Sequence, residues 1–434
     1  MSLLADIAKH TDSIARIARR PPGLYARMRA QMQAEDALDL SARMTMQKER
    51  LERVIQIARK VPYYDFLPAD AQLRDVPILD KETVRANARR FRPRMPGIIS
   101  KTTTSGTTGV PMPLFRSPGA ISWEQATIDH IVSLCGIEPV SARIFMLRAD
   151  DIKAPDDLEP PFWKVASRYK AVASSQHLCR ETVRHYIDFI RDFKPDILFA
   201  LPSSASLLVS LLEAEGVHLN IPLSVISSEV APADLRRGIR ERLNGEMIDL
   251  YGQGERLAFA WSTENGKFHF RPDYGAVEFQ NDTIGTELIA TGLQNRAMPL
   301  LRYNTGDIVL LPDNAGDEQL QHIAFGTAPF RGISGRVSEY IQMRGGRRIL
   351  SVHNILRDLP GVAVAQIVQH DFEHIEIILI PTGDFADQTL NILQKNIKNI
   401  LPAEVRWTVS IEQVPRRNAA GKCPLLMRLF DDAV

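Results

Sequence analysis

A loop of hydroxyl and glycine residues is the first feature of this chain whose residue types could do chemistry. It spans residues 102–111, with the sequence TTTSGTTGVP. Glycine lets a backbone turn tightly and approach a ligand, while hydroxyls and neighbouring amide N–H groups can surround anionic oxygens. No lysine follows the second glycine, so the loop is not a P-loop of the GxxxxGK[ST] type. The loop predicts a phosphate-binding segment, and a solvated linker is the alternative. The residues expected to hold phosphate are Thr104, Ser105, Gly106, Thr107, Thr108 and Gly109.

Four further segments place a polar or charged side chain on a glycine-bearing turn near an apolar run. Each is weak alone, because an Asp after Thr-Gly is commonly a turn residue and a Lys after glycine is commonly a solvated charge. The segments are YGQGER at 251–256, RYNTGD at 302–307, GRVSEYIQMRGGRRIL at 335–350 and RRNAAGKCPLL at 416–426.

Taken in this order, the five segments resemble the adenylate-forming superfamily of acyl- and aryl-CoA ligases, peptide-synthetase adenylation domains and luciferases. Within it, the likeness is to the phenylacetate–CoA ligase and CapK-like branch. Further likenesses are KVPYYDFL, VPILDKETVR, FKPDILFALPSSASLL and MPLLRYNTGD, so the resemblance extends from about residue 50 through nearly the whole chain. It implies that a small acid, aromatic or other, reacts with ATP to give acyl-AMP and pyrophosphate, after which the acyl group passes to CoA.

The resemblance also implies roles for individual residues. Lys422 would bridge the acid oxygen and the α-phosphate as a mobile point charge. Glu255 would bind Mg²⁺, a hard cation that prefers oxygen ligands. Asp307 would accept hydrogen bonds from the ribose hydroxyls. Arg336 would contact ribose or phosphate where the two domains join, with a plain surface ion pair as the alternative.

The same resemblance places the adenine and the acid. Tyr251 would stack on the adenine, with ordinary core packing as the alternative, and Gly252 and Gln253 would belong to the same nucleotide-binding segment. The backbone of Ser228, Glu229 and Val230 would form the opposite wall of that pocket. For the acid we can only nominate Trp123, Trp163, Phe199 and Pro202, and core packing of Trp163 or Phe199 is at least as good an explanation.

Three departures from the relatives limit this transfer. Ser338 stands where relatives usually have the Asp about which the chain pivots. The adenine wall reads Ser-Ser-Glu at 227–229 in place of Gly-Ala-Glu. The segment 148–169 is charged and proline-rich and does not resemble the glycine-rich aryl-pocket segment of phenylacetate ligases. The identity of the acid therefore stays open.

The elements that must position these residues are read from the hydrophobic pattern. Short apolar runs at 144–147, 196–201 and 223–229 are separated by helical stretches at 181–193 and 204–215, which favours an α/β fold with largely parallel strands. Antiparallel strands are expected at 269–311, and a strand and a helix at 373–381 and 389–400. Helices are expected at about 3–17 and 44–58, separated by Pro21 and Pro22.

A chain of 434 residues exceeds what one core usually serves. We expect an N-terminal adenylation domain at 1–335, with a helical start at about 1–60, and a small mobile α+β lid domain at 336–434.

Composition excludes several function classes. Lys and Arg number 53 against 52 Asp and Glu, which gives no electrostatic footprint for nucleic acid. Three scattered cysteines form neither a disulfide framework nor a zinc cluster, and no apolar run is long enough for a membrane span. We therefore expect a cytoplasmic protein, for which a homodimer is one option.

The acceptor stays open. A carrier-protein phosphopantetheine or an amine, in natural-product or polysaccharide biosynthesis, is the alternative to CoA. A non-catalytic nucleotide-binding module is a third hypothesis, but the presence of Lys422 and Glu255 argues against it.

Overall fold

The computed structural model divides the chain into two compact units, each assembled from two separate stretches of sequence. Unit 1 consists of Met1–Ser141 and Leu250–Ser334, and unit 2 consists of Ala142–Asp249 and Gly335–Val434. The described residues are 14–93, 99–103, 112–148, 152–154, 157–232, 234–262, 266–282, 285–336, 340–344, 348–349, 352, 355–356, 359–383, 385–402, 404–418 and 422–430.

Unit 1 begins with helices that are fixed to its body by ion pairs. Asp39 accepts a hydrogen bond from the Ala42 N–H at 2.8 Å and so caps the third helix, where the first four N–H groups lack intrahelical partners. Arg20 forms an ion pair with Asp129 at 2.6 Å, which ties the start of the chain to the fifth helix. The helices are α2 (Leu24–Asp36), α3 (Leu40–Ala58), α4 (Lys81–Ala86), α5 (Pro118–Leu134) and α9 (Asp317–Ala324), with 3-10 turns at Pro62–Tyr64 and Leu73–Asp75.

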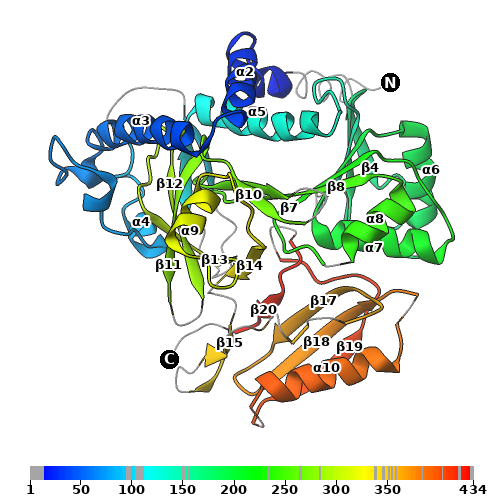
Figure 1. The fold of residues 1–434 in the computed structure, drawn as a ribbon. Coiled ribbons are helices and arrows are strands. Elements are labelled where there is room, and N and C mark those ends of the chain that lie inside the picture. The colour runs from blue at the N-terminus through cyan, green and yellow to red at the C-terminus, as the bar shows by residue number, and fades with distance from the viewer. Residues whose placement is uncertain are drawn as a thin grey trace. The chain divides into compact units, whose positions relative to one another are not determined.

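The strand pairs β1–β2, β9–β10, β11–β12 and β12–β13 of unit 1 are antiparallel (Figure 1), and strands and helices of this unit share one apolar cluster. Gly275 is required in this core, because a Cβ there would lie 1.6 Å from the Leu257 carbonyl oxygen. The central sheet has the order β11–β12–β13–β14, beside the hairpins β1–β2 and β9–β10. The bounds are β1 (Ser100–Thr103), β2 (Pro113–Arg116), β9 (Phe259–Ser262), β10 (Phe268–Phe270), β11 (Gly275–Asn281), β12 (Thr286–Gly292), β13 (Tyr303–Leu310) and β14 (Gly332–Arg336), the last of which crosses into unit 2.

Unit 2 is built on a mostly parallel sheet with the order β7–β6–β3–β5–β4. The pairs β3–β5, β3–β6 and β6–β7 are parallel, and β4–β5 is antiparallel. Helices α7 and α8 lie side by side (Figure 1). The bounds are β3 (Ile144–Arg148), β4 (Trp163–Ser167), β5 (Lys170–Ser174), α6 (Val183–Phe193), β6 (Ile197–Ala200), α7 (Pro202–Ala214), β7 (Leu223–Ser227), α8 (Leu235–Leu243) and β8 (Glu246–Gly252), which crosses into unit 1.

The C-terminal segment of unit 2 has a sheet and a core of its own. Helix α10 packs along one face of this sheet through Leu393 and Ile397 (Figure 1). The residues Val364, Val368 and Ile380 lie instead in the same apolar cluster as α7. The sheet order is β19–β18–β17–β20, beside a small β15–β16 pair. The bounds are β15 (Ile341–Gln342), β16 (Arg348–Ile349), β17 (Val362–Gln369), β18 (His374–Pro381), α10 (Asp387–Ile400), β19 (Arg406–Ile411) and β20 (Leu426–Arg428).

The predicted fold class, a mixed α/β protein with parallel and antiparallel sheets, is confirmed. One helix differs from expectation: after Pro21 and Pro22 the chain resumes as a helix at Leu24 and not near residue 44. The reason is that α2 buries only Met28 and Met32, so its sequence carries little apolar periodicity. The division at 335/336 stays a prediction, because the segment Gly335–Val434 groups here with Ala142–Asp249.

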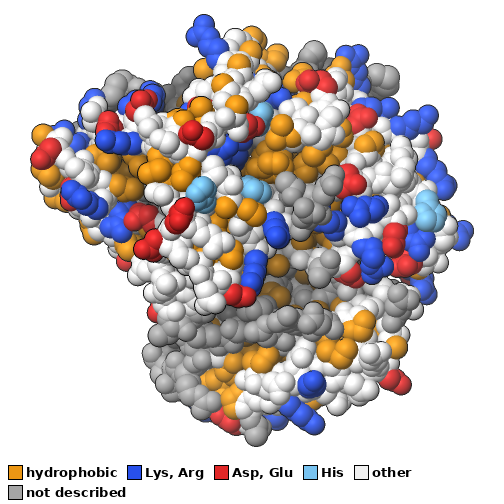
Figure 2. All heavy atoms as spheres, viewed as in Figure 1, with side chains coloured by type: hydrophobic (Ala, Val, Ile, Leu, Met, Phe, Trp, Pro, Cys, Tyr) orange, Lys and Arg blue, Asp and Glu red, His pale blue; other side chains and the backbone are white. Residues whose placement is uncertain are grey.

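The surface in view carries both signs of charge. In Figure 2, Lys and Arg side chains are interspersed with Asp and Glu side chains, as the nearly equal numbers of the two in the sequence lead one to expect. Within the described ranges, no helix combines the length and apolarity needed to cross a bilayer.

Candidate active site

Two of the predicted nucleotide motifs, far apart in the sequence, meet in unit 1. The Tyr251 hydroxyl donates a hydrogen bond to Asp307 Oδ2 at 2.6 Å, and Gln253 Nε2 donates in turn to the Tyr251 hydroxyl. Burial, reinforced by the neighbouring Asp307 carboxylate, raises the pKa of Tyr251 well above its ordinary value. Tyr251 therefore stays a neutral donor, and Asp307, which is 5% exposed, is held in a defined orientation.

A bulge in β13 directs Asp307 toward Tyr251. Ile289 pairs with Asn304 and Glu287 pairs with Ile308, so Thr305, Gly306 and Asp307 lie opposite the single residue Leu288. Gly306 has a φ of 69°, a left-handed conformation that glycine adopts without steric cost. The sequence predicts a tight turn at this position, and the structure corrects that to an irregularity inside a continuous strand.

Side-chain hydrogen bonds fix the bulge. The Asn304 side-chain oxygen accepts from the Gly306 N–H at 2.8 Å. The Thr305 hydroxyl accepts from the Asp307 N–H at 3.1 Å and donates to the Leu288 carbonyl at 2.9 Å. The residues of the NTGD sequence thus satisfy the backbone groups that the bulge removes from the ladder.

Glu255 lies in the same cluster. It is 8% exposed, and its Oε1 accepts a hydrogen bond from the Tyr303 hydroxyl at 3.3 Å. The turn that presents it is closed by the Arg256 N–H, which donates to the Gln253 carbonyl at 3.0 Å. Arg256 then pairs with Glu124 on α5 at 2.6 Å, which anchors the turn. Sequence reasoning did not single out Tyr303, although it lies within the RYNTGD motif.

The donor set around Glu255 can be tested against Mg²⁺. Among the described residues, no group of three or more His, Cys, Asp or Glu side chains could hold a metal ion. Mg²⁺ usually keeps several waters and binds through one or two carboxylates together with substrate phosphates. A single buried carboxylate fits that mode of binding and does not fit an all-protein metal cage.

Unit 2 gathers further predicted residues at the carboxyl ends of its parallel strands, the edge at which α/β sheets bind ligands. Ser228, Glu229 and Val230 follow β7 directly. Ser228 has a φ of 80°, and its hydroxyl accepts a hydrogen bond from Arg148 Nη2 at 3.3 Å. The same guanidinium lies 5.7 Å from the ring centre of Phe199, a residue of β6. Sequence reasoning did not single out Arg148, because its segment was described only as charged and proline-rich.

Lys422 lies in the loop before β20, within unit 2. Its N–H donates to the Asn418 side-chain oxygen at 3.0 Å, and its carbonyl accepts from the Asn418 N–H at 2.9 Å. The next residue, Cys423, donates its N–H to Glu229 Oε1 at 2.7 Å. The Lys422 loop is therefore held beside the end of β7.

The nominated acid-site residues lie in both units. In unit 1, Trp123 on α5 is buried, with the Arg50 guanidinium 5.4 Å from its ring centre. In unit 2, the Trp163 ring stacks on Phe189 at 4.3 Å, and Pro202 is the first residue of α7. These contacts are those of packed side chains, and the assignment of any of them to an acid pocket stays a prediction.

Some predicted residues lie outside the described structure. These are Thr104, Ser105, Gly106, Thr107, Thr108 and Gly109 of the hydroxyl-rich loop, together with Ser338. Arg336 is described only in its backbone, at the end of β14. The assignments of all these residues stay predictions.

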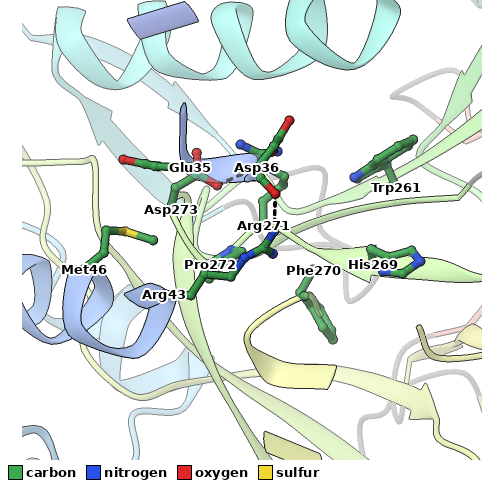
Figure 3. A pocket seen from close by; sticks show the side chains of 11 residues that line it. Glu35, Asp36, Arg43, Met46, Trp261, His269, Phe270, Arg271, Pro272 and Asp273 are labelled. Carbon is green, nitrogen blue, oxygen red and sulfur yellow. Dashed lines mark hydrogen bonds and ion pairs between the residues drawn. The ribbon is translucent and has the colours of Figure 1, made fainter. Parts of the chain in front are cut away.

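Unit 1 contains a pocket of about 280 Å³ (Figure 3), and none of the predicted nucleotide residues lines it. Arg271 donates to both Asp36 and Asp273, and His130 lies 2.6 Å from the Asp36 carboxylate. The Arg50 guanidinium pairs with Glu35. We interpret this network as an anchor that joins α2 to the segment after β10. The pocket is lined by Glu35, Asp36, Arg43, Met46, Trp261, His269, Phe270, Arg271, Pro272, Asp273 and Gly326.

Comparison with known proteins extends the interpretation of fold and site. No protein-family model matches the chain. Protein CapK of Staphylococcus aureus is 23% identical over 332 residues, covering 75% of this chain and 72% of CapK. A phenylacetate-coenzyme A ligase of Pseudomonas putida is 32% identical over 145 residues, covering 30% of this chain but only 33% of the ligase. The crystal structure of 2-hydroxyisobutyryl-CoA ligase in the postadenylation state matches with a TM-score of 0.58 at 16% identity, over 89% of both chains.

The predicted resemblance to the phenylacetate–CoA ligase and CapK-like branch of the adenylate-forming superfamily is confirmed by these relatives. The fold of the chain is similar to that of the matched CoA ligase.

Proposed function

We propose that this protein joins a small carboxylic acid to AMP at the expense of ATP and then passes the acyl group to CoA. The observation that carries the proposal is the hydrogen bond of 2.6 Å between Tyr251 and Asp307. It joins the motif expected to stack on adenine to the motif expected to bind ribose. Two motifs that serve one nucleotide must lie together, whereas two unrelated surface turns need not. The relatives named as phenylacetate-coenzyme A ligases support the same chemistry.

The chemistry suggests a task for each residue predicted from the motifs. A carboxylate is a poor electrophile, and transfer to AMP gives it a good leaving group. Two anions must then meet, so the protein must position them and neutralise charge. The aromatic face of Tyr251 stacks on adenine, and the carboxylate of Asp307 accepts the ribose hydroxyls. The ammonium group of Lys422 bridges the acid oxygen and the α-phosphate, and Arg336 binds ribose or phosphate.

Glu255 is the residue that would hold Mg²⁺. When bound, the ion supplies positive charge to the phosphate oxygens of ATP. The Tyr303 hydroxyl at 3.3 Å orients the carboxylate for that role. The hydroxyl-rich loop, residues 104–109, is the segment proposed to hold the phosphates. The wall formed by Ser228, Glu229 and Val230 is proposed to close the adenine site.

The test separates the acid from the acceptor. Purified protein with ATP and Mg²⁺ is screened against aromatic and short aliphatic acids for pyrophosphate release. Each active acid is then incubated with CoA, with a phosphopantetheinylated carrier protein, or with an amine, and the product is identified by mass spectrometry. An acyl-CoA product supports the proposal. Transfer only to the carrier protein or the amine supports the alternative acceptor, and no pyrophosphate release with any acid contradicts adenylation.

A further inference from the structure

The side chain of Glu229 makes contacts that its backbone role in the predicted adenine pocket does not require. Its Oε2 accepts a hydrogen bond from the Ser203 N–H at 3.0 Å, and its Oε1 accepts one from the Cys423 N–H at 2.7 Å. Ser203 is the second residue of α7, and Cys423 directly follows Lys422. One carboxylate therefore joins the start of α7 to the loop that contains Lys422.

The start of α7 lacks a cap of its own, which explains why a carboxylate is favourable there. Leu201 is the N-cap residue and makes no side-chain capping bond, and Pro202 has no N–H to donate. The exposed N–H groups and the helix dipole both favour a negative charge at this end. The left-handed conformation of Ser228, with a φ of 80°, turns the chain immediately before Glu229. Glu229 thus caps α7 from another part of the chain.

Two further contacts join the Lys422 loop to the same helix. Arg417 Nη2 donates to the Ser204 hydroxyl at 3.2 Å. Cys423 is 8% exposed and belongs to the apolar cluster that contains Leu208 of α7. Burial is general and non-directional, whereas the Glu229 bonds need one position of the loop. The carboxylate, which accepts from both α7 and the loop, therefore contributes directly to fixing where the loop docks, together with the bond from Arg417 to Ser204.

We propose that Glu229 is a docking catch: its carboxylate holds the Lys422 loop against α7 and must release the Cys423 N–H before the C-terminal segment can move. This inference rests on the proposed function only in its consequence for catalysis, which is that docking positions Lys422 for acyl-AMP formation. Glu229 is then a positioning residue, because its side chain acts through the loop and not on the reacting atoms.

The test of docking does not depend on any enzymatic activity. Arg417 is half-buried and contacts Ser204, so trypsin should cut after it only when the loop has left α7. The protein is digested briefly under native conditions, and the peptide beginning at Asn418 is quantified by mass spectrometry. Cleavage after Arg168, an exposed residue between β4 and β5, provides the internal reference.

The informative variant is Glu229→Gln. Both partners of Glu229 are N–H donors, and an amide has one acceptor oxygen where the carboxylate has two, so one bond is lost. Loss of one charge-assisted hydrogen bond predicts about tenfold faster cleavage after Arg417. The matched control is Glu241→Gln on α8, whose carboxylate makes only an exposed pair with Arg237 at 3.5 Å and which should leave the rate unchanged.

Two outcomes would contradict the proposal that Glu229 holds the Lys422 loop against α7. One is equal cleavage after Arg417 in Glu229→Gln and the parent. The other is faster cleavage accompanied by faster amide exchange in β6, which would mean that the variant loosens the whole unit.

A second measurement tests the consequence for catalysis. Glu229→Gln should slow acyl-AMP formation about tenfold and leave acyl transfer from supplied acyl-AMP at the parental rate. Equal slowing of both steps contradicts a positioning role. If the protein activates no acid yet shows the expected cleavage, the docking role of Glu229 is supported and the proposed function is contradicted.

Discussion

Replacement of Tyr251 by phenylalanine should lower the free energy of unfolding of unit 1 by about 2 kcal/mol. The change removes one hydroxyl and keeps the aromatic ring. It breaks the 2.6 Å hydrogen bond to Asp307 and removes the acceptor of Gln253 Nε2. A hydrogen bond to a charged group contributes about 1.5–3 kcal/mol, and the buried Asp307 would lose this donor.

The assay is a thermal melt followed by a double-mutant cycle. For a unit of this size, a loss of 2 kcal/mol corresponds to a fall in Tm of about 4–8 °C. The variants Tyr251→Phe, Asp307→Asn and the pair should give a coupling energy of about 1 kcal/mol or more, because the two side chains are in direct contact. The control Tyr63→Phe, whose ring stacks on Phe91 at 4.0 Å, tests the general effect of removing a tyrosine hydroxyl.

The reasoning is refuted by a coupling energy below about 0.5 kcal/mol, which is the scatter expected for independent sites. A fall in Tm no larger than that of Tyr63→Phe would refute it as well. Either result would mean that the motifs of Tyr251 and Asp307 are adjacent without being energetically coupled.

Three other predictions concern chemistry, pH and packing. Lys422→Ala should reduce pyrophosphate release with an active acid by about 10²–10³-fold while ATP still binds, and an unchanged rate would remove Lys422 from the reaction. Burial raises the pKa of Asp249 from 3.8 to about 7, so the folded state binds this proton more tightly and the free energy of unfolding falls as pH rises from about 4 to 7. Asp249→Asn should therefore stabilise the protein by about 2 kcal/mol at pH 8 and little at pH 4, which urea unfolding at the two pH values would measure. The figure is about half of what the full pKa shift implies, because the side chain is partly exposed. Gly275→Ala should cost about 3 kcal/mol or more because its Cβ would meet the Leu257 carbonyl, whereas Gly119→Ala, with no atom within 4 Å of the new Cβ, should fold normally.

The sequence predicted the elements that have strong periodicity or strong apolar runs. The predicted strands at 144–147 and 223–229 correspond to β3 and β7, and the helix predicted at 389–400 corresponds to α10. Helix α2 was missed, because its two buried methionines leave no apolar stripe to read. Local pattern alone therefore accounts for strands such as β3 and β7, and it misses α2, an element held chiefly by ion pairs and neighbouring helices.

The site was predictable as a set of motifs and not as a set of contacts. The sequence identifies Tyr251 and Asp307, but the hydrogen bond between them depends on the register of β12 and β13. The backbone of Glu229 was expected near adenine, and the bonds of its carboxylate to Ser203 and Cys423 come from packing of the C-terminal segment against α7. Such pairings are non-local, so no spacing in the sequence reveals them.

The irregular stretch of β13 also has a consequence for how this protein could vary. Neighbouring residues of a regular strand face opposite sides, and each added or lost residue exchanges them. Tyr303 and Asp307, which reach Glu255 and Tyr251, flank or belong to the stretch in which three residues lie opposite one residue of the partner strand. A single-residue deletion in this stretch would reverse the alternation and turn the carboxylate away, whatever residues remain. The length of this segment, in addition to its Asn304, Thr305 and Gly306, should thus be a property that natural or laboratory variants preserve.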